Sequence, residues 1–360
     1  MPTRRAFLRD TIATAAALAA GAPLDRLHAQ TQAQAQPPAD PFTFDLHLHP
    51  GLFFWRGTPQ YPGDEAVRRT LRAMRAGGVR AGFVSLVADG PLIELGANAV
   101  TVKGAYRAGE AQEEFLRQLA ALRELLPQAE TRVVTSLGEC RAAIRDGQVG
   151  AFLSCEGSEF LDGDPGRVEL LWEQGIRSIQ LVHYAPNLAG DLQTEPAQHH
   201  GLSPFGREVV RRMRARRMLV DVAHATMETV ADVARVADVP IILSHSILKI
   251  DDSRRLNARA ITPAHATLVA KTGGVIGAWP SATNASFAEF VENTKRLADV
   301  VGVEHVGLGT DMDGNLRPVL ATYGQFADWT AALASHGFTA REVAQMAGEN
   351  MARVIRQVIG

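Results

Sequence analysis

Residues 44–49 read FDLHLH, a short run that predicts a buried strand with two histidines at its end. Side chains alternate along a strand, so residues two apart point to the same side. His47 and His49 therefore share one face and are suited to bind one metal ion together. Asp45 lies on the same face but deeper in the fold. The alternative is a pair of polar residues that only line the mouth of a barrel.

Five further runs share this form, because each is short and apolar and stops on His, Glu or Asp. They are GAFLSCE (150–156), IRSIQLVH (176–183), MLVDVAH (218–224), PIILSH (240–245) and HVGLGTD (305–311). In a parallel barrel all strands end at the same face, and their last side chains converge on one pocket. Four or five imidazoles with two carboxylates in one pocket are suited to a pair of divalent metal ions.

Patterns typical of strands and helices alternate along the chain of 360 residues. Strands are predicted over 43–49, 79–87, 150–156, 176–183, 218–224, 239–245, 274–279 and 305–311. Helical patterns between them include 64–76, 206–216, 226–236 and 262–271, with Thr226 and Thr262 as N-caps of the last two. This order predicts an α/β fold, a (β/α)8 TIM-type barrel, rather than an open doubly wound sheet.

Two of the loops that follow strands are long enough to be inserts. Residues 89–148 are predicted to contain a helix at 104–126, an extra strand at 132–136 and a second helix at 138–146. Residues 184–205 follow the fourth strand and, as a βα loop, should lie on the active-site face. A final helix at 339–358 is expected to close the fold.

The start of the chain is predicted to be a targeting sequence rather than part of the folded domain. Residues 1–29 are expected to be an export signal, in which Arg4-Arg5 precede an apolar stretch at 11–22 that is too short to span a bilayer. The arginine pair favours the twin-arginine route, with an ordinary secretory signal or a disordered start as the alternatives. A polar linker at 30–40 follows, and residues 41–360 are predicted to form one barrel domain. We therefore expect a periplasmic or secreted protein without a membrane span after signal removal.

The residue type at each strand end suggests a chemical role. Glu156 is the candidate bridge, because paired ions need an anion between them and none of the four lysines ends a predicted strand. His224 and His245 would complete a second metal site with it. Asp311 is suited to bind a metal ion and to take a proton from an attacking water. His183 is expected to donate to the developing oxyanion, with a ligand, substrate-lining or structural role as the alternative.

Seven blocks of sequence, in this order, resemble the renal (membrane) dipeptidase family of zinc peptidases, family M19 of the amidohydrolase-type barrels. They are CEG (155–157), LVHYAPN (181–187), GLSPFGREVV (201–210), LVDVAHAT (219–226), ILSHS (242–246), GGVIG (273–277) and HVGLGTDMDG (305–314). The resemblance runs through most of residues 42–355, and several blocks in the right order are far more specific than any single motif.

The resemblance implies two zinc ions per chain and a homodimer. The first zinc would be bound by His47, His49, Glu156 and Asp311, and the second by Glu156, His224 and His245. His183 would match the histidine that contacts the scissile carbonyl. Arg259 would match the arginine that binds the substrate carboxylate, although Arg254 and Arg255 lie nearby in the sequence. A guanidinium group is suited to bidentate carboxylate binding.

The first strand departs from the family pattern, which has His-x-Asp where this chain has His47-Leu48-His49. The histidine removes one negative charge from the first metal site. We expect a weaker or more Lewis-acidic first site, with a changed substrate or metal preference as a further consequence. Residues 51–62 also differ from the family pattern, so dipeptide specificity is less secure than metal-dependent hydrolysis.

These observations predict an exported hydrolase that cleaves small dipeptides with a hydroxide that bridges two zinc ions. One rival is another reaction on the same barrel, catalysed by an amidase for N-acyl amino acids, a lactonase or esterase, or a deaminase. A second rival is a non-catalytic periplasmic binding protein. The formal net charge of −2 and the absence of a basic stripe argue against nucleic acid as a partner.

Overall fold

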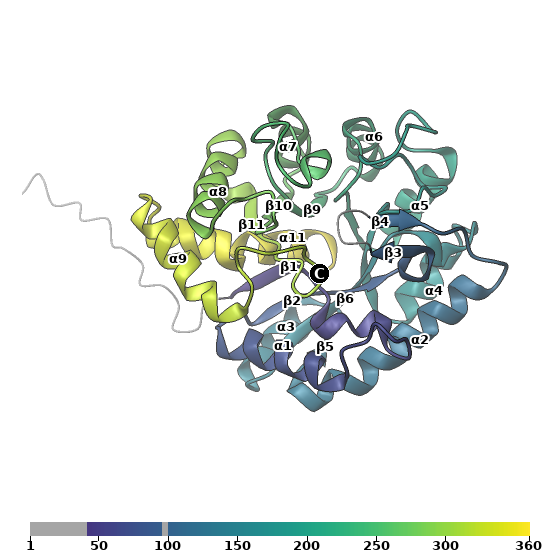
Figure 1. Ribbon diagram of the computed structural model, residues 1–360, viewed down its shortest axis with the longest axis horizontal. Coiled ribbons are helices and arrows are strands. Elements are labelled where there is room, and N and C mark those ends of the chain that lie inside the picture. The colour runs from purple at the N-terminus through teal and green to yellow at the C-terminus, as the bar shows by residue number, and fades with distance from the viewer. Residues whose placement is uncertain (1–41, 96–99) are drawn as a thin grey trace, which may run out of the picture. The chain divides into compact units, whose positions relative to one another are not determined.

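The computed structural model of this chain describes residues 42–95 and 100–360. The predicted export signal (1–29) and linker (30–40) lie outside the described residues. Parallel strands form a closed barrel in the order β2-β1-β11-β10-β9-β8-β7-β6, and β6 pairs back with β2 (Figure 1). This arrangement confirms the predicted (β/α)8 TIM-type fold. The barrel strands are β1 Phe44–Leu48, β2 Ala81–Val87, β6 Val149–Glu156, β7 Ile176–Gln180, β8 Leu219–Asp221, β9 Ile242–Ser246, β10 Val275–Ala278 and β11 Val306–Leu308.

Helices surround the strands, as Figure 1 shows. Their bounds are α1 Asp64–Ala76, α2 Glu110–Leu125, α3 Leu137–Arg145, α4 Arg167–Glu173, α5 Pro204–Ala215, α6 Met227–Ala237, α7 Pro263–Lys271, α8 Phe287–Val301, α9 Phe326–Ser335, α10 Ala340–Ala344 and α11 Asn350–Val358. Both predicted N-caps are confirmed, because the Thr226 and Thr262 side chains accept hydrogen bonds from the first turns of α6 and α7. Within the described ranges, no helix combines the length and the apolar character that crossing a membrane requires.

The first insert differs from its prediction. Its helix α2 begins at Glu110 rather than at 104, after Gly109 with a φ of 89°. Before it lies an antiparallel hairpin of β3 (Ile93–Leu95) and β4 (Val100–Val102), which the sequence pattern did not predict. Strands of three residues are too short to show a clear alternation. The expected extra strand is present as β5 (Thr131–Val133), which pairs with the start of β6.

Several barrel strands end earlier than predicted. The last residues of β7, β8 and β11 each lie three positions before the histidine or aspartate that was expected to end the strand. His224 and Asp311 have positive φ values of 65° and 52°, which no extended strand can contain. The candidate site residues of these strands therefore lie in the first turn of the βα loops, still at the carboxyl end of the barrel.

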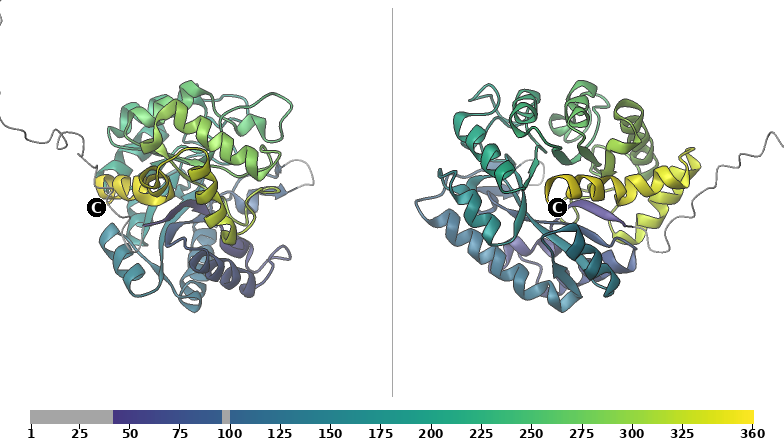
Figure 2. Two further views of the ribbon diagram at one scale, coloured as in Figure 1. Left: turned by 90° about the vertical axis from the view of Figure 1, so that its left-hand side faces the viewer. Right: turned by 180° about the vertical axis from the view of Figure 1, so that it is seen from behind.

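The amino end of the barrel is closed by apolar packing. The Phe83 ring contacts both Phe44 and Phe152, with centroid distances of 5.2 Å and 5.7 Å. Residues Met351 and Ile355 of α11 belong to the same buried cluster. The right-hand view of Figure 2 shows this yellow helix crossing the back of the barrel. With one end filled in this way, the carboxyl end is left for polar chemistry.

The predicted final helix at 339–358 is interrupted. A π-helical turn at Gln345–Glu349 separates α10 from α11, and Gly348 within it has non-helical dihedral angles. A Cβ atom at Gly348 would lie 2.5 Å from the carbonyl oxygen of Phe42, so a side chain does not fit there. The close approach of this turn to the start of β1 is the reason that the helix is not continuous.

Candidate active site

Glu156 lies at the centre of the polar end of the barrel. It is the last residue of β6, and only 2% of it is exposed. Five imidazole rings approach its carboxylate within 4 Å. The Nε2 atoms lie at 3.1 Å for His49, 3.3 Å for His47, 3.4 Å for His183, 3.6 Å for His224 and 3.8 Å for His245. The carboxylate therefore joins all the predicted histidines into one cluster.

One half of the cluster contains the histidines of β1. The Nε2 atoms of His47 and His49 are 3.0 Å apart, and Asp311 Oδ1 lies 3.5 Å from His49 Nε2. Ligand atoms of these three residues all lie within 4.8 Å of one another. The backbone N–H of Asp311 donates to the His47 carbonyl at 2.9 Å, which ties the turn after β11 to β1. The structure thus brings together the predicted first metal site.

The other half contains His224 and His245, whose Nε2 atoms are 2.9 Å apart. His183 also belongs here, because its ligand atom lies within 4.8 Å of those of Glu156 and His224. His183 was predicted to contact the developing oxyanion rather than a metal ion, and its ring lies at the edge of the predicted ligands. Trp279 covers this half, with its ring centroid 5.3 Å from that of His245.

Contacts of the Nδ1 atoms orient the histidine rings so that their Nε2 atoms face Glu156. His49 Nδ1 lies 2.9 Å from the Ser85 carbonyl oxygen, which can only accept, so the hydrogen of the neutral ring is on Nδ1. The Nε2 lone pair then faces His47 and Glu156. His245 Nδ1 contacts the Ser244 hydroxyl at 3.0 Å, which leaves its Nε2 toward His224. Converging lone pairs on buried, oriented rings are the donor set that a divalent cation needs.

The pKa values of the ionisable groups in the cluster differ strongly from their ordinary values. Burial lowers the pKa of His47, but the charges of Glu156 and Asp311 outweigh burial and raise it to about 9. Burial opposes ionisation of Glu156, yet His183 and His47 hold the pKa of its carboxyl well below the usual range. A cation that binds between these residues must therefore displace a proton from His47.

The pKa values of the second pair of histidines, His224 and His245, are shifted in the opposite direction to that of His47. Burial, followed by the charge of Arg259, holds the pKa of His224 well below its ordinary value. Burial, followed by the charge of His47, has the same effect on the pKa of His245. Both rings are neutral at pH 7, which is the form that binds metal ions.

Asp311 differs from the other carboxylates. Burial raises its pKa to about 6, although His49 and His47 act in the opposite direction. A carboxylate with a pKa just below neutrality is ionised at pH 7 and still basic enough to accept a proton. This combination suits the role of a general base.

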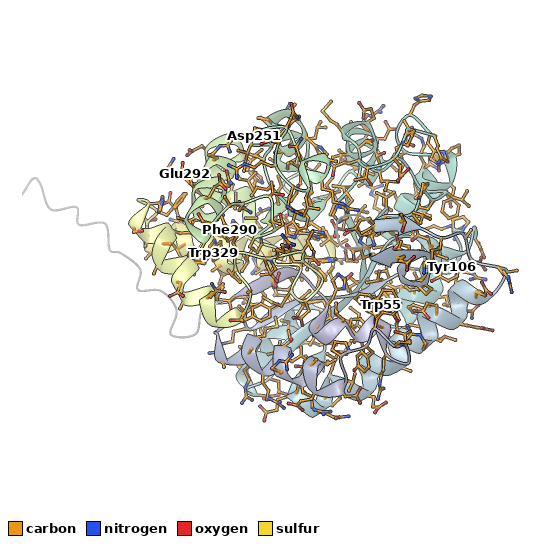
Figure 3. All side chains as sticks on the ribbon, in the orientation of Figure 1. Trp55, Tyr106, Asp251, Phe290, Glu292 and Trp329 are labelled. Atoms are coloured by element: carbon orange, nitrogen blue, oxygen red, sulfur yellow. The ribbon has the colours of Figure 1, made fainter. Side chains whose placement is uncertain are left out.

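A cavity of about 110 Å³ reaches Glu156 from outside and has an apolar wall. That wall is formed by Leu52, Phe54, Trp55, Val87 and Ile93. Trp55, labelled in Figure 3, comes from the segment that follows β1. An outer cavity of about 470 Å³ shares Tyr184, Arg259, Trp279 and Asp311 with the inner one, and Val100, Val102 and Leu316 also line it. The hairpin β3–β4 therefore contributes residues to both cavities.

Arg259 is the arginine that faces the cavities, whereas Arg255 is exposed and Arg254 pairs with Glu289. Arg259 is only 3% exposed, and its guanidinium lies 3.8 Å from the centroid of the Tyr184 ring. Its Nη2 donates to the His183 carbonyl at 3.3 Å, and its buried Nη1 has no partner within the described residues. A buried, unpaired donor at a cavity wall is suited to an anionic ligand group.

Two residues at this end were missed by the sequence argument. Asp89 lies two residues beyond β2 and contacts His183, and Trp279 follows β10 directly and lines both cavities. The predicted second and seventh strands were the two without an acidic or histidine residue at their ends. An aspartate shortly after a predicted barrel strand was the available signal for Asp89.

Asp313 lies in the last βα loop, two residues after Asp311, and its side chain makes a long-range contact. Its φ of 67° fits a turn. Its Oδ2 atom accepts hydrogen bonds from the backbone N–H of Gly51 and from the Thr70 hydroxyl, both at 2.6 Å. The carboxylate thus ties this loop to the segment that follows β1.

The sequence pattern that describes the membrane dipeptidase family (peptidase family M19) matches residues 39–359. The chain belongs to this family. Among curated relatives, dipeptidase tcpJ of Claviceps purpurea is 29% identical over 231 residues, 59% of this chain and 52% of that protein. An uncharacterized dipeptidase of Schizosaccharomyces pombe is 30% identical over 219 residues, 57% of this chain and 52% of that protein. The chain thus spans about half the length of these two relatives.

Solved structures of the same family share the fold. Dipeptidase AC, a metallopeptidase of family M19, has a TM-score of 0.75 at 23% identity and covers 89% of this chain and 99% of its own. A metallopeptidase from Rhodobacter sphaeroides, liganded with a phosphinate mimic of the dipeptide L-Ala-D-Ala, has a TM-score of 0.74 at 22% identity. It covers 89% of this chain and 100% of its own. At these identities, the likeness shows the membrane dipeptidase fold.

Proposed function

We propose that this chain is an exported, metal-dependent dipeptidase with two zinc ions per chain. The observation that carries the proposal is the cluster of Glu156 with five histidines and Asp311 at the open end of the barrel. Membership of the membrane dipeptidase family supports the reaction class. The twin-arginine export route, the periplasmic or secreted location and a homodimer are parts of the same proposal.

The donor set suits two ions that share Glu156. His47, His49 and Asp311 would hold one ion with this carboxylate, and His224 and His245 would hold the other. When bound, the two ions would activate a water molecule as the nucleophile and would polarise the carbonyl of the substrate. All of these ligand positions carry oxygen or imidazole nitrogen donors, which zinc accepts readily.

The remaining steps belong to side chains at the cavity wall. Asp311 takes the proton of the attacking water and passes it to the leaving amine. His183 donates from Nε2 to the oxyanion that develops on the carbonyl. Arg259 binds the C-terminal carboxylate of the dipeptide with the donor that has no partner among the described residues. The apolar wall of the inner cavity excludes water and accommodates a small side chain.

Metal content and dipeptide cleavage, measured before and after chelation, test the proposal. Protein purified without added metal is expected to contain two zinc ions per chain and to cleave dipeptides until chelator is added. Two metal ions with cleavage of N-acyl amino acids or lactones instead would favour another hydrolase on this barrel. A chain that binds no metal would point to a binding protein.

Arg259→Lys is expected to lower kcat/KM for dipeptides by about tenfold to a hundredfold, mainly through KM. The reason is that lysine can keep one charge-assisted bond to the carboxylate but not the second, and one such bond contributes about 1.5–3 kcal/mol. A dipeptide with an amidated C-terminus should be cleaved poorly by the original protein and no worse by the variant. Steady-state kinetics with free and amidated L-Ala-L-Ala measure both effects, and Arg255→Lys is the control because Arg255 is exposed. An equal loss on both substrates would contradict carboxylate binding by Arg259.

His49→Asp is expected to tighten the weaker zinc site by about tenfold, because the change adds a negative charge beside Glu156 and Asp311. His49→Asn is the matched control. It removes the same hydrogen bond to the Ser85 carbonyl but adds no charge. Zinc titration of metal-free protein measures the two affinities. Two equally tight sites in the unchanged protein would contradict the effect assigned to His49.

A further inference from the structure

Asp89 is a buried carboxylate whose bonds all go to one short segment of the chain. It lies two residues beyond β2 and is 0% exposed. Its Oδ1 lies 2.7 Å from His183 Nδ1, and its Oδ2 accepts from the backbone N–H groups of Tyr184 and Ala185, both at 2.9 Å. Three donors from three consecutive residues thus converge on one side chain.

The segment that Asp89 holds carries two groups of the proposed site. His183 extends its ring toward Glu156, with Nε2 3.4 Å from Oε1. The next residue, Tyr184, places its ring under the Arg259 guanidinium at 3.8 Å, and the His183 carbonyl accepts from Arg259. A substitution of Asp89 can therefore displace both His183, the proposed carbonyl-binding group, and Arg259, the proposed carboxylate-binding group, although Asp89 itself does not contact the substrate.

The contact also decides where the His183 ring carries hydrogen. An ionised carboxylate only accepts, so Nδ1 of His183 must be an N–H donor. The bond from Nδ1–H to a buried carboxylate holds the ring in one orientation, with Nε2 toward Glu156, as the buried aspartate orients the histidine of a serine protease triad.

We propose that Asp89 is a positioning residue for the reaction, which fixes the orientation of the His183 ring and the place of its ring hydrogen and, through Tyr184, the place of Arg259. This inference rests on the proposed dipeptidase function. A purely structural carboxylate would need only its two backbone bonds, so the ring contact is the part to be tested.

Asp89→Asn separates the ring contact from the backbone contacts. The amide oxygen can keep the bonds to Tyr184 and Ala185, while the amide N–H then faces His183 Nδ1. Because the amide is a donor, Nδ1 becomes an acceptor and the only ring hydrogen moves to Nε2. A donor to an oxyanion contributes about 10²- to 10³-fold, and part of this contribution is lost when the ring is no longer held in its orientation. We expect kcat to fall about tenfold to thirtyfold, with KM within about threefold.

Asp89→Ala removes the backbone bonds as well, and it should raise KM in addition because Arg259 loses its support. Asp191→Asn is the matched control. Asp191 also holds a loop through backbone N–H groups, those of Gln198, His199 and Gly201, and these three bonds involve no ring of the proposed site. The control variant should leave kcat within about twofold.

The second readout is independent of activity. Nitrogen NMR of histidine-labelled, metal-free protein reports which ring nitrogen carries hydrogen, and the His183 signals are assigned from their absence in His183→Gln. Hydrogen on Nδ1 in the original protein and on Nε2 alone in Asp89→Asn is the expected result. The same hydrogen position in both proteins, or an unchanged kcat in Asp89→Asn, would overturn the proposal. If no variant cleaves dipeptides, the dipeptidase function fails, whereas NMR still decides the Asp89 contact.

Discussion

Replacement of Asp311 by asparagine is expected to lower kcat by about a thousandfold while the protein remains folded. A general base contributes about 10²- to 10⁴-fold, and an amide cannot accept the proton of the attacking water. The backbone N–H at this position can still donate to the His47 carbonyl, so the turn after β11 should keep its place. The measurement is dipeptide cleavage under excess zinc, so that weaker metal binding does not contribute, together with circular dichroism.

Asp313→Asn provides the comparison for this prediction. Asp313 lies two residues away and lines the same inner cavity, but its carboxylate accepts bonds from Gly51 and Thr70. An asparagine oxygen can accept the same bonds, so activity should fall far less. An Asp311→Asn protein that retains activity within about tenfold of the original would assign the proton transfer to another group.

Glu156→Gln is expected to abolish tight binding of the second zinc ion and, with it, dipeptide cleavage. Metal ions about 3.5–4 Å apart repel each other unless an anion lies between them, and Glu156 is the carboxylate that contacts both halves of the cluster. Glutamine has nearly the same shape but no charge. Elemental analysis after dialysis against a limited zinc concentration measures the metal content per chain.

Glu159→Gln is the matched control, because the same exchange takes place three residues further along the chain. Burial, and then the charge of Asp89, raises the pKa of Glu159 to about 8. At pH 7 this carboxyl is therefore largely neutral, and glutamine resembles its prevailing form. Two zinc ions should remain in Glu159→Gln. Two tightly bound ions in Glu156→Gln would exclude the bridging role.

The fold could be predicted from the sequence because buried parallel strands leave strong local patterns. The runs that end at Glu156 and His245 are apolar over most of their length, and the structure has strands there. The exact strand ends could not be predicted in the same way. His224 and Asp311, which have positive φ, form backbone hydrogen bonds to residues far away in the sequence, Gln193 and His47, and a local pattern does not show such contacts.

The candidate site was predicted where one residue type at a strand end implies one chemistry. The five histidines and Glu156 do converge as the barrel geometry requires. Asp89 escaped prediction because its role depends on a bond to His183, 94 positions later. The choice of Arg259 over its neighbours likewise became clear only from burial, since three nearby arginines look alike in sequence.

The hairpin β3–β4 has a consequence for how this catalyst could diversify. Its two short strands pair only with each other among the described strands, and yet Ile93 faces the inner cavity while Val100 and Val102 line the outer one. The proposed zinc ligands are anchored separately on the barrel. New hairpins could therefore be exchanged by evolution or by loop grafting to retune substrate choice, while the chemical machinery is inherited unchanged.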